Sequence, residues 1–159
     1  MSLTTKIVGG IGVVGTAIAL AAVAPAAASA APTTCLSPAG PTTTLTDALS
    51  SCSSISDATS AAASYGYFGT GDATADLNSL ALALGLTGGQ ATSTSSNGAA
   101  PAAIAYGADS VASATGTAPG LSIAIAAPGS TVSIDSVTGA LCDGPGFAGS
   151  LVTLQACLG

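Results

Sequence analysis

Seven aspartates are the only side chains in this sequence that suit general acid–base chemistry. The chain contains no His and no Glu, and Lys6 is its single cation among Lys and Arg. Ser and Thr are abundant, but beyond Lys6 no His, Lys or Glu is available to activate a hydroxyl nucleophile, and no G-x-S-x-G turn occurs. We therefore predict that the protein is not an enzyme, and a hydrolase that uses only carboxylates is the one catalytic hypothesis left.

Asp72, Asp76 and Asn78 form the densest group of oxygen ligands. On a strand, Asp72 and Asp76 would lie about 13 Å apart on one face, which is wider than the carboxylate pair of a glycosidase. The segment also lacks the spacing of an EF-hand and the glycine-rich nonapeptide of calcium β-rolls. We expect solvated acids at a strand edge and no cofactor, and Ca²⁺ binding by these three residues is the alternative.

Tyr65, Tyr67 and Phe68 are the only cluster of aromatic side chains. Such a cluster suits binding of a glycan or of an apolar ligand. Large apolar side chains also close the ends of narrow folds. We favour this second role, a plug at the open end of the fold, and keep ligand binding as the alternative.

Four cysteines lie in two groups near the ends of the chain: Cys35 and Cys52, then Cys142 and Cys157. In an exported chain, two disulfides are the default, and three connectivities are available. Short loops close most readily, which favours Cys35–Cys52 and Cys142–Cys157. No C-x-x-C pair or His supports a metal site instead.

Residues 1–30 have the layout of a secretory signal peptide. Lys6 precedes an uncharged apolar run, and Ala28 and Ala30 form an A-x-A site that predicts cleavage before Ala31. The alternative is an uncleaved membrane anchor; cleavage would leave no membrane span. The cleaved chain would keep seven aspartates and no cationic side chain, a net side-chain charge of −7. That charge excludes nucleic acid and anionic lipid as partners.

A repeat of about twenty residues runs through 71–159. Its fourth positions hold a hydroxyl column made of Ser93, Ser113, Ser133 and Thr153. The flanking third positions are Thr92, Ala112, Val132 and Val152, and the fifth are Thr94, Ala114, Ile134 and Leu154, so that small or apolar residues alternate with the column. This alternation predicts a strand with one buried face. A second strand follows in each unit, around Leu82, Ile104 and Ile123, and Gly, Pro, Asn and Asp gather in the turns.

Two short strands per repeat, built mainly from Ala, Ser and Thr, predict a thin coil with little interior room. We therefore predict an all-β protein, a short β-solenoid or β-roll of two-strand rungs with disulfide-tied ends. A small β-sandwich or meander is the alternative fold. Disorder is disfavoured because the chain is apolar, sparsely charged and patterned.

Two segments precede the repeat. Residues 31–46 are rich in Pro and Thr, a composition that opposes regular structure and suits a linker or glycosylated stalk. Residues 47–70 are expected to form an N-terminal cap, as either a short helix or an irregular rung. Solenoids need such caps because their last strands otherwise present open edges.

The stretch GADSVASATGTAPGLSIAIAAPGSTVSID (107–135) resembles the head repeats of trimeric autotransporter adhesins. That resemblance implies β-roll rungs, although the coiled-coil stalk and anchor of those adhesins are missing. With its Ala-rich leader and the ending GALCDGPGFAGSLVTLQACLG (139–159), the whole chain resembles small secreted actinobacterial proteins of unknown function. That second resemblance implies export.

These observations predict a secreted or cell-envelope protein with a structural or interaction role. Its stacked surface would contact a protein or glycan at the cell surface, or a second copy of itself. A glycan- or calcium-binding module is the alternative function, and the carboxylate-only hydrolase ranks last.

Overall fold

The structure is a computed structural model that describes residues 31–159, which form fourteen β-strands and no helix. The predicted signal peptide lies outside the described residues. Seven strands form sheet A, in the spatial order β1 (Thr33–Pro38), β4 (Ala61–Tyr67), β6 (Leu80–Leu86), β8 (Ala99–Tyr106), β10 (Gly120–Ala126), β13 (Gly146–Ser150) and β14 (Ala156–Leu158). The other seven form sheet B, in the order β12 (Gly139–Asp143), β11 (Thr131–Asp135), β9 (Val111–Gly116), β7 (Gln90–Ser95), β5 (Thr70–Ala75), β3 (Ser50–Ser56) and β2 (Thr43–Asp47).

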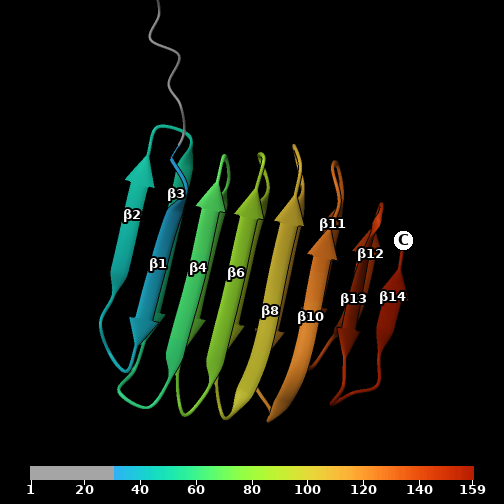
Figure 1. Cartoon of the computed structure of the whole chain (residues 1–159). Coiled ribbons are helices and arrows are strands. Elements are labelled where there is room, and N and C mark those ends of the chain that lie inside the picture. Colours follow the sequence, from blue (N-terminus) through green and yellow to red (C-terminus); the bar gives the residue numbers. More distant parts are fainter. Residues whose placement is uncertain (1–30) are drawn as a thin grey trace, which may run out of the picture.

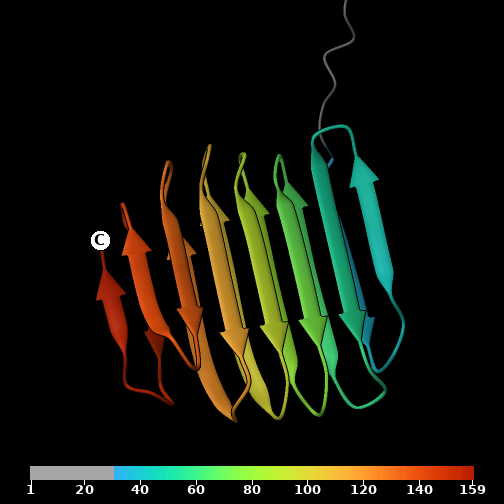
Figure 2. The same ribbon diagram turned by 180° about the vertical axis from the view of Figure 1, so that it is seen from behind.

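The chain is a β-solenoid, as predicted, because from β3 to β11 it crosses alternately between the two sheets. Strands that follow one another within a sheet pair in parallel, for example β4 with β6 and β5 with β7. Figure 1 shows sheet A in front, and Figure 2 shows sheet B from the opposite side. The alternatives of a sandwich or meander would join neighbouring strands of one sheet by short hairpins, which these parallel pairs cannot use.

The rungs are not of equal length, which corrects the predicted hydroxyl column. In sheet B, Cys52 pairs with Gly71, Gly71 with Ala91, Ala91 with Ala112 and Ala112 with Val132, so successive offsets are 19, 20, 21 and 20 residues. The longest offset arises in the turn between β8 and β9, and it pairs Thr92, not Ser93, with Ser113. Ser113 and Ser133 do stack, but Ser93 is buried and Thr153 lies in a turn beyond β13.

Small side chains fill the space between the sheets. The core consists almost entirely of alanines, with Val132 and Ile134 as its largest members, and many buried serines lie beside them. The serine hydroxyls bond to main-chain carbonyls or to each other; Ser93 Oγ donates to Pro101 O at 2.9 Å. At Gly85 even a methyl group would collide with the backbone of Thr70. The sheets therefore leave little room between them, and Val132 and Ile134 of β11 are the bulkiest side chains that point inward.

Both ends of the stack are closed by antiparallel strands, which corrects two expectations. Residues 31–46 include β1 and most of β2, which pair with β4 and β3 and give the Thr-rich segment backbone partners. Residues 47–70 contain no helix; β3 and β4 form a regular rung because every second residue points inward and is Ser, Cys, Ala or Gly. At the other end, β12, β13 and β14 turn back in the same way, so the repeat stops at β11.

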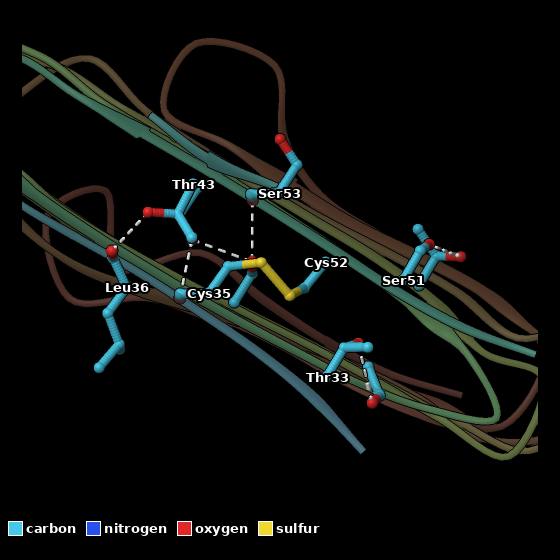
Figure 3. The surroundings of a disulfide bond; sticks show 11 residues. Thr33, Cys35, Leu36, Thr43, Ser51, Cys52 and Ser53 are labelled. Carbon is cyan, nitrogen blue, oxygen red and sulfur yellow. Dashed lines mark hydrogen bonds between the residues drawn. A yellow bond between two sulfur atoms is a disulfide. The ribbon is translucent and has the colours of Figure 1, made fainter. Parts of the chain in front are cut away.

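The two disulfides join the sheets at the ends of the stack, with the predicted connectivity. Cys35 of β1 bonds Cys52 of β3, and Cys142 of β12 bonds Cys157 of β14. Their Cα atoms are 5.7 and 5.9 Å apart, respectively. Figure 3 shows the first bond lying between the sheets, near the hydrogen bond from Thr43 Oγ1 to Leu36 O. Each bond therefore fixes the distance between the sheets at its end.

Candidate functional site

The outer face of sheet A carries most of the bulky apolar side chains of the solenoid. On β6, the sequence LALALGL points its alanines and Gly85 inward and its leucines outward. Leu80 is 58% exposed and Leu82 is 41% exposed. The strands β8 and β10 continue the face with Tyr106, Leu121 and Ile125, all of them exposed. This arrangement reverses the usual rule, because the narrow interior accepts only the small member of each alternating pair.

The apolar face, as we call the outward side chains of β1, β4, β6, β8, β10 and β13, is corrugated. One row across these strands reads Leu36, Ala63, Leu82, Ala102, Ile123 and Gly149, so large and small residues alternate from strand to strand. A hollow of about 450 Å³ lies in this part of the face, lined by the ridges Leu36, Leu82 and Leu121 and the alanines between them. A second hollow, of about 420 Å³, is lined by Ile123 and Phe147, among others.

Sheet B has a different outer surface, made mainly of hydroxyl side chains. Thr74, Thr94 and Thr115 stack in register on β5, β7 and β9. In the next row, Asp72 is followed by Thr92 and Ser113. Partial desolvation by its surroundings raises the pKa of Asp72. The surface of sheet B is therefore polar, and it carries charge.

The seven aspartates all avoid the apolar face. Asp72 lies on the outer side of β5, Asp47, Asp135 and Asp143 end strands of sheet B, and the remaining three occupy turns. Asp57 is the best bonded: its Oδ2 accepts from Leu77 N at 2.7 Å and its Oδ1 from Thr59 N at 2.8 Å. These bonds, that from Leu77 above all, hold the pKa of Asp57 far below its usual range. The charges therefore collect on sheet B and along the edges.

The aromatic cluster does not plug the end of the fold, because β1 and β2 already cover that end. Tyr65 and Tyr67 point outward from β4 on the apolar face, and the Phe68 ring meets that of Tyr67 edge-on, with centroids 4.8 Å apart. Tyr67 shares a row with Leu86 and Tyr106. The cluster is thus one part of a wider apolar surface.

The candidate ligand group Asp72, Asp76 and Asn78 is divided between two elements. Asp72 lies on the flat side of β5, whereas Asp76 and Asn78 belong to the exposed turn that follows. Asn78 has a φ of +59°, and its backbone N donates to Thr59 Oγ1 at 3.1 Å. Within residues 31–159, no three acidic, His or Cys side chains come together as a potential metal site. The geometry favours neither a Ca²⁺ site nor a carboxylate pair here.

Sequence reasoning missed the apolar face although its signal was present. Leu80, Leu82 and Leu84 alternate with small residues in the sequence of β6, but alternation alone does not say which member is buried. The deciding signal is that the partner strands in sheet B supply only Ala, Ser and Gly to the interior. Because both sheets point small residues inward, every large residue on sheet A must face out.

Within the described part of the chain, no helix is long and apolar enough to cross a membrane.

The chain belongs to a family of unknown function (DUF6764), whose model matches residues 1–159. No curated protein and no solved structure matched it. The family assigns no activity, so the surface itself must guide any functional proposal.

Proposed function

We propose that this member of a family of unknown function is a non-enzymatic structural or interaction protein of the cell exterior or envelope, and that it works through the apolar face. The observation that carries the proposal is the separation of side chains between the two sheets. Most of the leucines and isoleucines that lie in strands, and all three tyrosines, belong to sheet A, whereas the charges lie on sheet B and at the turns. Contiguous apolar patches of this kind mark interaction sites on soluble proteins.

A protein surface suits this face better than a glycan. Sugar recognition needs hydrogen-bonding groups that converge on the ligand, and carboxylates and amides are the usual ones. The apolar face offers only the tyrosine hydroxyls and Thr34 besides its hydrocarbon side chains. Ridges of Leu and grooves of Ala instead match the side chains of another folded surface.

An exterior location is supported by both disulfides, which are stable in oxidising compartments. A further observation fits cleavage after Ala30. The backbone nitrogen of Ala31 donates to Asp47 Oδ2 at 2.9 Å, and this bond lowers the pKa of that carboxyl. Cleavage would turn this nitrogen into an α-ammonium group, so the only cation of the mature chain would lie beside a carboxylate.

Site-specific photo-cross-linking tests the proposal in the source cells. Benzoylphenylalanine is placed at position 106 on the apolar face or, as a matched control, at position 141 on sheet B; the native side chains there are 55% and 62% exposed. We expect a cross-linked adduct from position 106 and none from position 141. The additional substitution Leu82→Asp should abolish the adduct, because a carboxylate cannot be buried cheaply in an apolar contact.

Two results would refute the proposal. One is that positions 106 and 141 give adducts with equal yield, and the other is that position 106 gives none. The additional control Thr94→Asp adds the same charge to sheet B and should leave the adduct unchanged.

A further inference from the structure

We infer that the apolar face binds a second copy of this chain, face to face, about a two-fold axis that runs parallel to the strands between β6 and β8. This inference rests on the proposed function and names its partner. It follows from the order of large and small residues across sheet A, from the extent of the face and from the position of the charges.

The alternation across sheet A is self-complementary. In the row that runs from Leu36 to Gly149, the strands β1, β6 and β10 present large residues, and β4, β8 and β13 present small ones. Six strands that alternate in this way have a ridge at one end and a groove at the other. In this row, reversing their order places every ridge opposite a groove. The neighbouring row is large from Tyr65 to Phe147, so there the two copies would meet through side chains of similar size.

A two-fold axis along the strands produces this reversal. It brings β6 opposite β8, β4 opposite β10 and β1 opposite β13 of the second copy. The resulting contacts pair Leu82 with Ala102, Ile123 with Ala63, and Leu36 with Gly149. An axis along the stack would instead set each strand against its own copy, ridge on ridge. Isologous contacts of this kind are the commonest way in which identical subunits associate.

The extent of the face suits a dimer of modest stability. Six strands spaced by about 4.8 Å, each about six residues long, give a flat area of roughly 600 Å² per copy. Standard interfaces bury about 800 Å² per partner, with the weaker ones near 600 Å². The relief of the leucine ridges adds to the flat area. We therefore expect association at roughly 10–100 μM protein.

The charges also favour a second copy over a lipid surface. None of the seven aspartates lies in a strand of sheet A, so two faces can meet without burying like charges. Proteins that lie on membranes usually carry Lys or Arg beside their apolar face. The described residues contain neither, and Asp57 and Asp76 occupy turns at its edge. Those aspartates would oppose contact with an anionic headgroup layer.

Sedimentation equilibrium of the purified protein, expressed from the full chain in an oxidising compartment, tests the inference. We expect a dimer for the native protein and for Thr94→Asp, and weakening on the order of 100-fold for Leu82→Asp. Each variant side chain faces solvent in the isolated fold, and a thermal unfolding curve of each confirms folding. A native protein that stays monomeric to about 500 μM, well above the range expected from the interface area, would overturn the inference.

A swap of ridge and groove tests the axis itself. Ala102→Leu fills a groove and should weaken association about tenfold or more, because the added side chain overpacks the contact with the Leu82 ridge. Leu82→Ala removes the opposing ridge and should weaken it as well. The double variant Leu82→Ala/Ala102→Leu should restore affinity to within about threefold of the native value, because the two positions face each other across the axis. A dimer that is disrupted by Ala102→Leu but not rescued by the swap would overturn this axis.

Failure of the inference can be told apart from failure of the proposed function. If the purified protein is monomeric but position 106 still cross-links in cells in a Leu82-dependent way, another protein occupies the face. Vesicles of anionic and of neutral lipid provide the remaining comparison. Binding to either one that is lost in Leu82→Asp, with no dimer, would assign the face to lipid and overturn the inference.

Discussion

Asp57 joins two consecutive turns of the stack. Its carboxylate accepts from Thr59 in its own turn and from Leu77 in the next, twenty residues away. Backbone N–H groups that turn toward a carboxylate favour its charged form, which explains the lowered pKa. The residue therefore holds the spacing of neighbouring rungs at one edge.

Replacing Asp57 with Asn should lower the unfolding temperature at pH 7, because the amide keeps only one acceptor oxygen and can no longer accept from both Leu77 and Thr59. Folding lowers the pKa of Asp57, so its stabilising effect is complete above the unfolded value, near pH 4, and shrinks as the pH falls below it. Thermal melts of both proteins at pH 7 and at lower pH measure this difference.

The matched control for that comparison is Asp143→Asn, which removes the same charge from an exposed strand end. Equal loss of stability in the two variants would mean that net charge, not the Leu77 bond, is responsible.

At the scale of the strand, size decides which side chain faces in. Ala103 of β8 is fully buried and pairs in register with Ala83 and Ala124, so three alanines line the same interior row. Its neighbour Ala102 faces outward on the same strand. The two positions therefore lie next to each other in one strand and differ in which face of the sheet their side chains occupy.

Ala103→Leu should destabilise the fold by about 1–3 kcal/mol or prevent folding, because the interior has no space for the added methylenes. Ala102→Leu should leave the unfolding midpoint close to the native value. Urea denaturation at low micromolar concentration, below the range expected for the proposed dimer, compares them. The interior assignment would be wrong if Ala102→Leu proved the more damaging change.

The sequence predicted the all-β solenoid, the two-strand rung and the disulfide pairing because these depend on local features: turn residues, alternation and loop length. It placed Ala112, Ala114, Val132 and Ile134 correctly on the inner side of their strands. It failed for Thr92 and Thr94, since one additional residue in a turn reverses which side chains face in. Register depends on pairing between rungs, which a fixed repeat length does not reveal.

The caps and the apolar face were harder to predict for the same reason. Pro and Thr in 31–46 oppose regular structure locally, but pairing of β1 with β4 and of β2 with β3 outweighs that preference. The exposed leucines become understandable only when both sheets are considered together. Neither sheet alone shows how narrow the interior is.

For the whole molecule, the result is a slab with two unlike sides. One side is corrugated and apolar, the other is hydroxylated and acidic, and a disulfide fixes the sheet separation at each end. Because so little of the bulky apolar surface is used inside, the interior cannot explain why the chain carries those leucines and tyrosines. The proposed contact with another protein surface would explain both their number and their placement.

Hydroxyl-radical labelling of the protein in its source cells, read by mass spectrometry, tests that account most directly. The reference is the purified protein, folded and diluted below the range expected for the proposed association. The account predicts that labelling of Leu80, Tyr106 and Leu121 falls several-fold in cells, while Leu45 and Leu141 of sheet B stay as reactive as in the reference. Labelling of the apolar face that matches the dilute protein, or protection confined to sheet B, would contradict it.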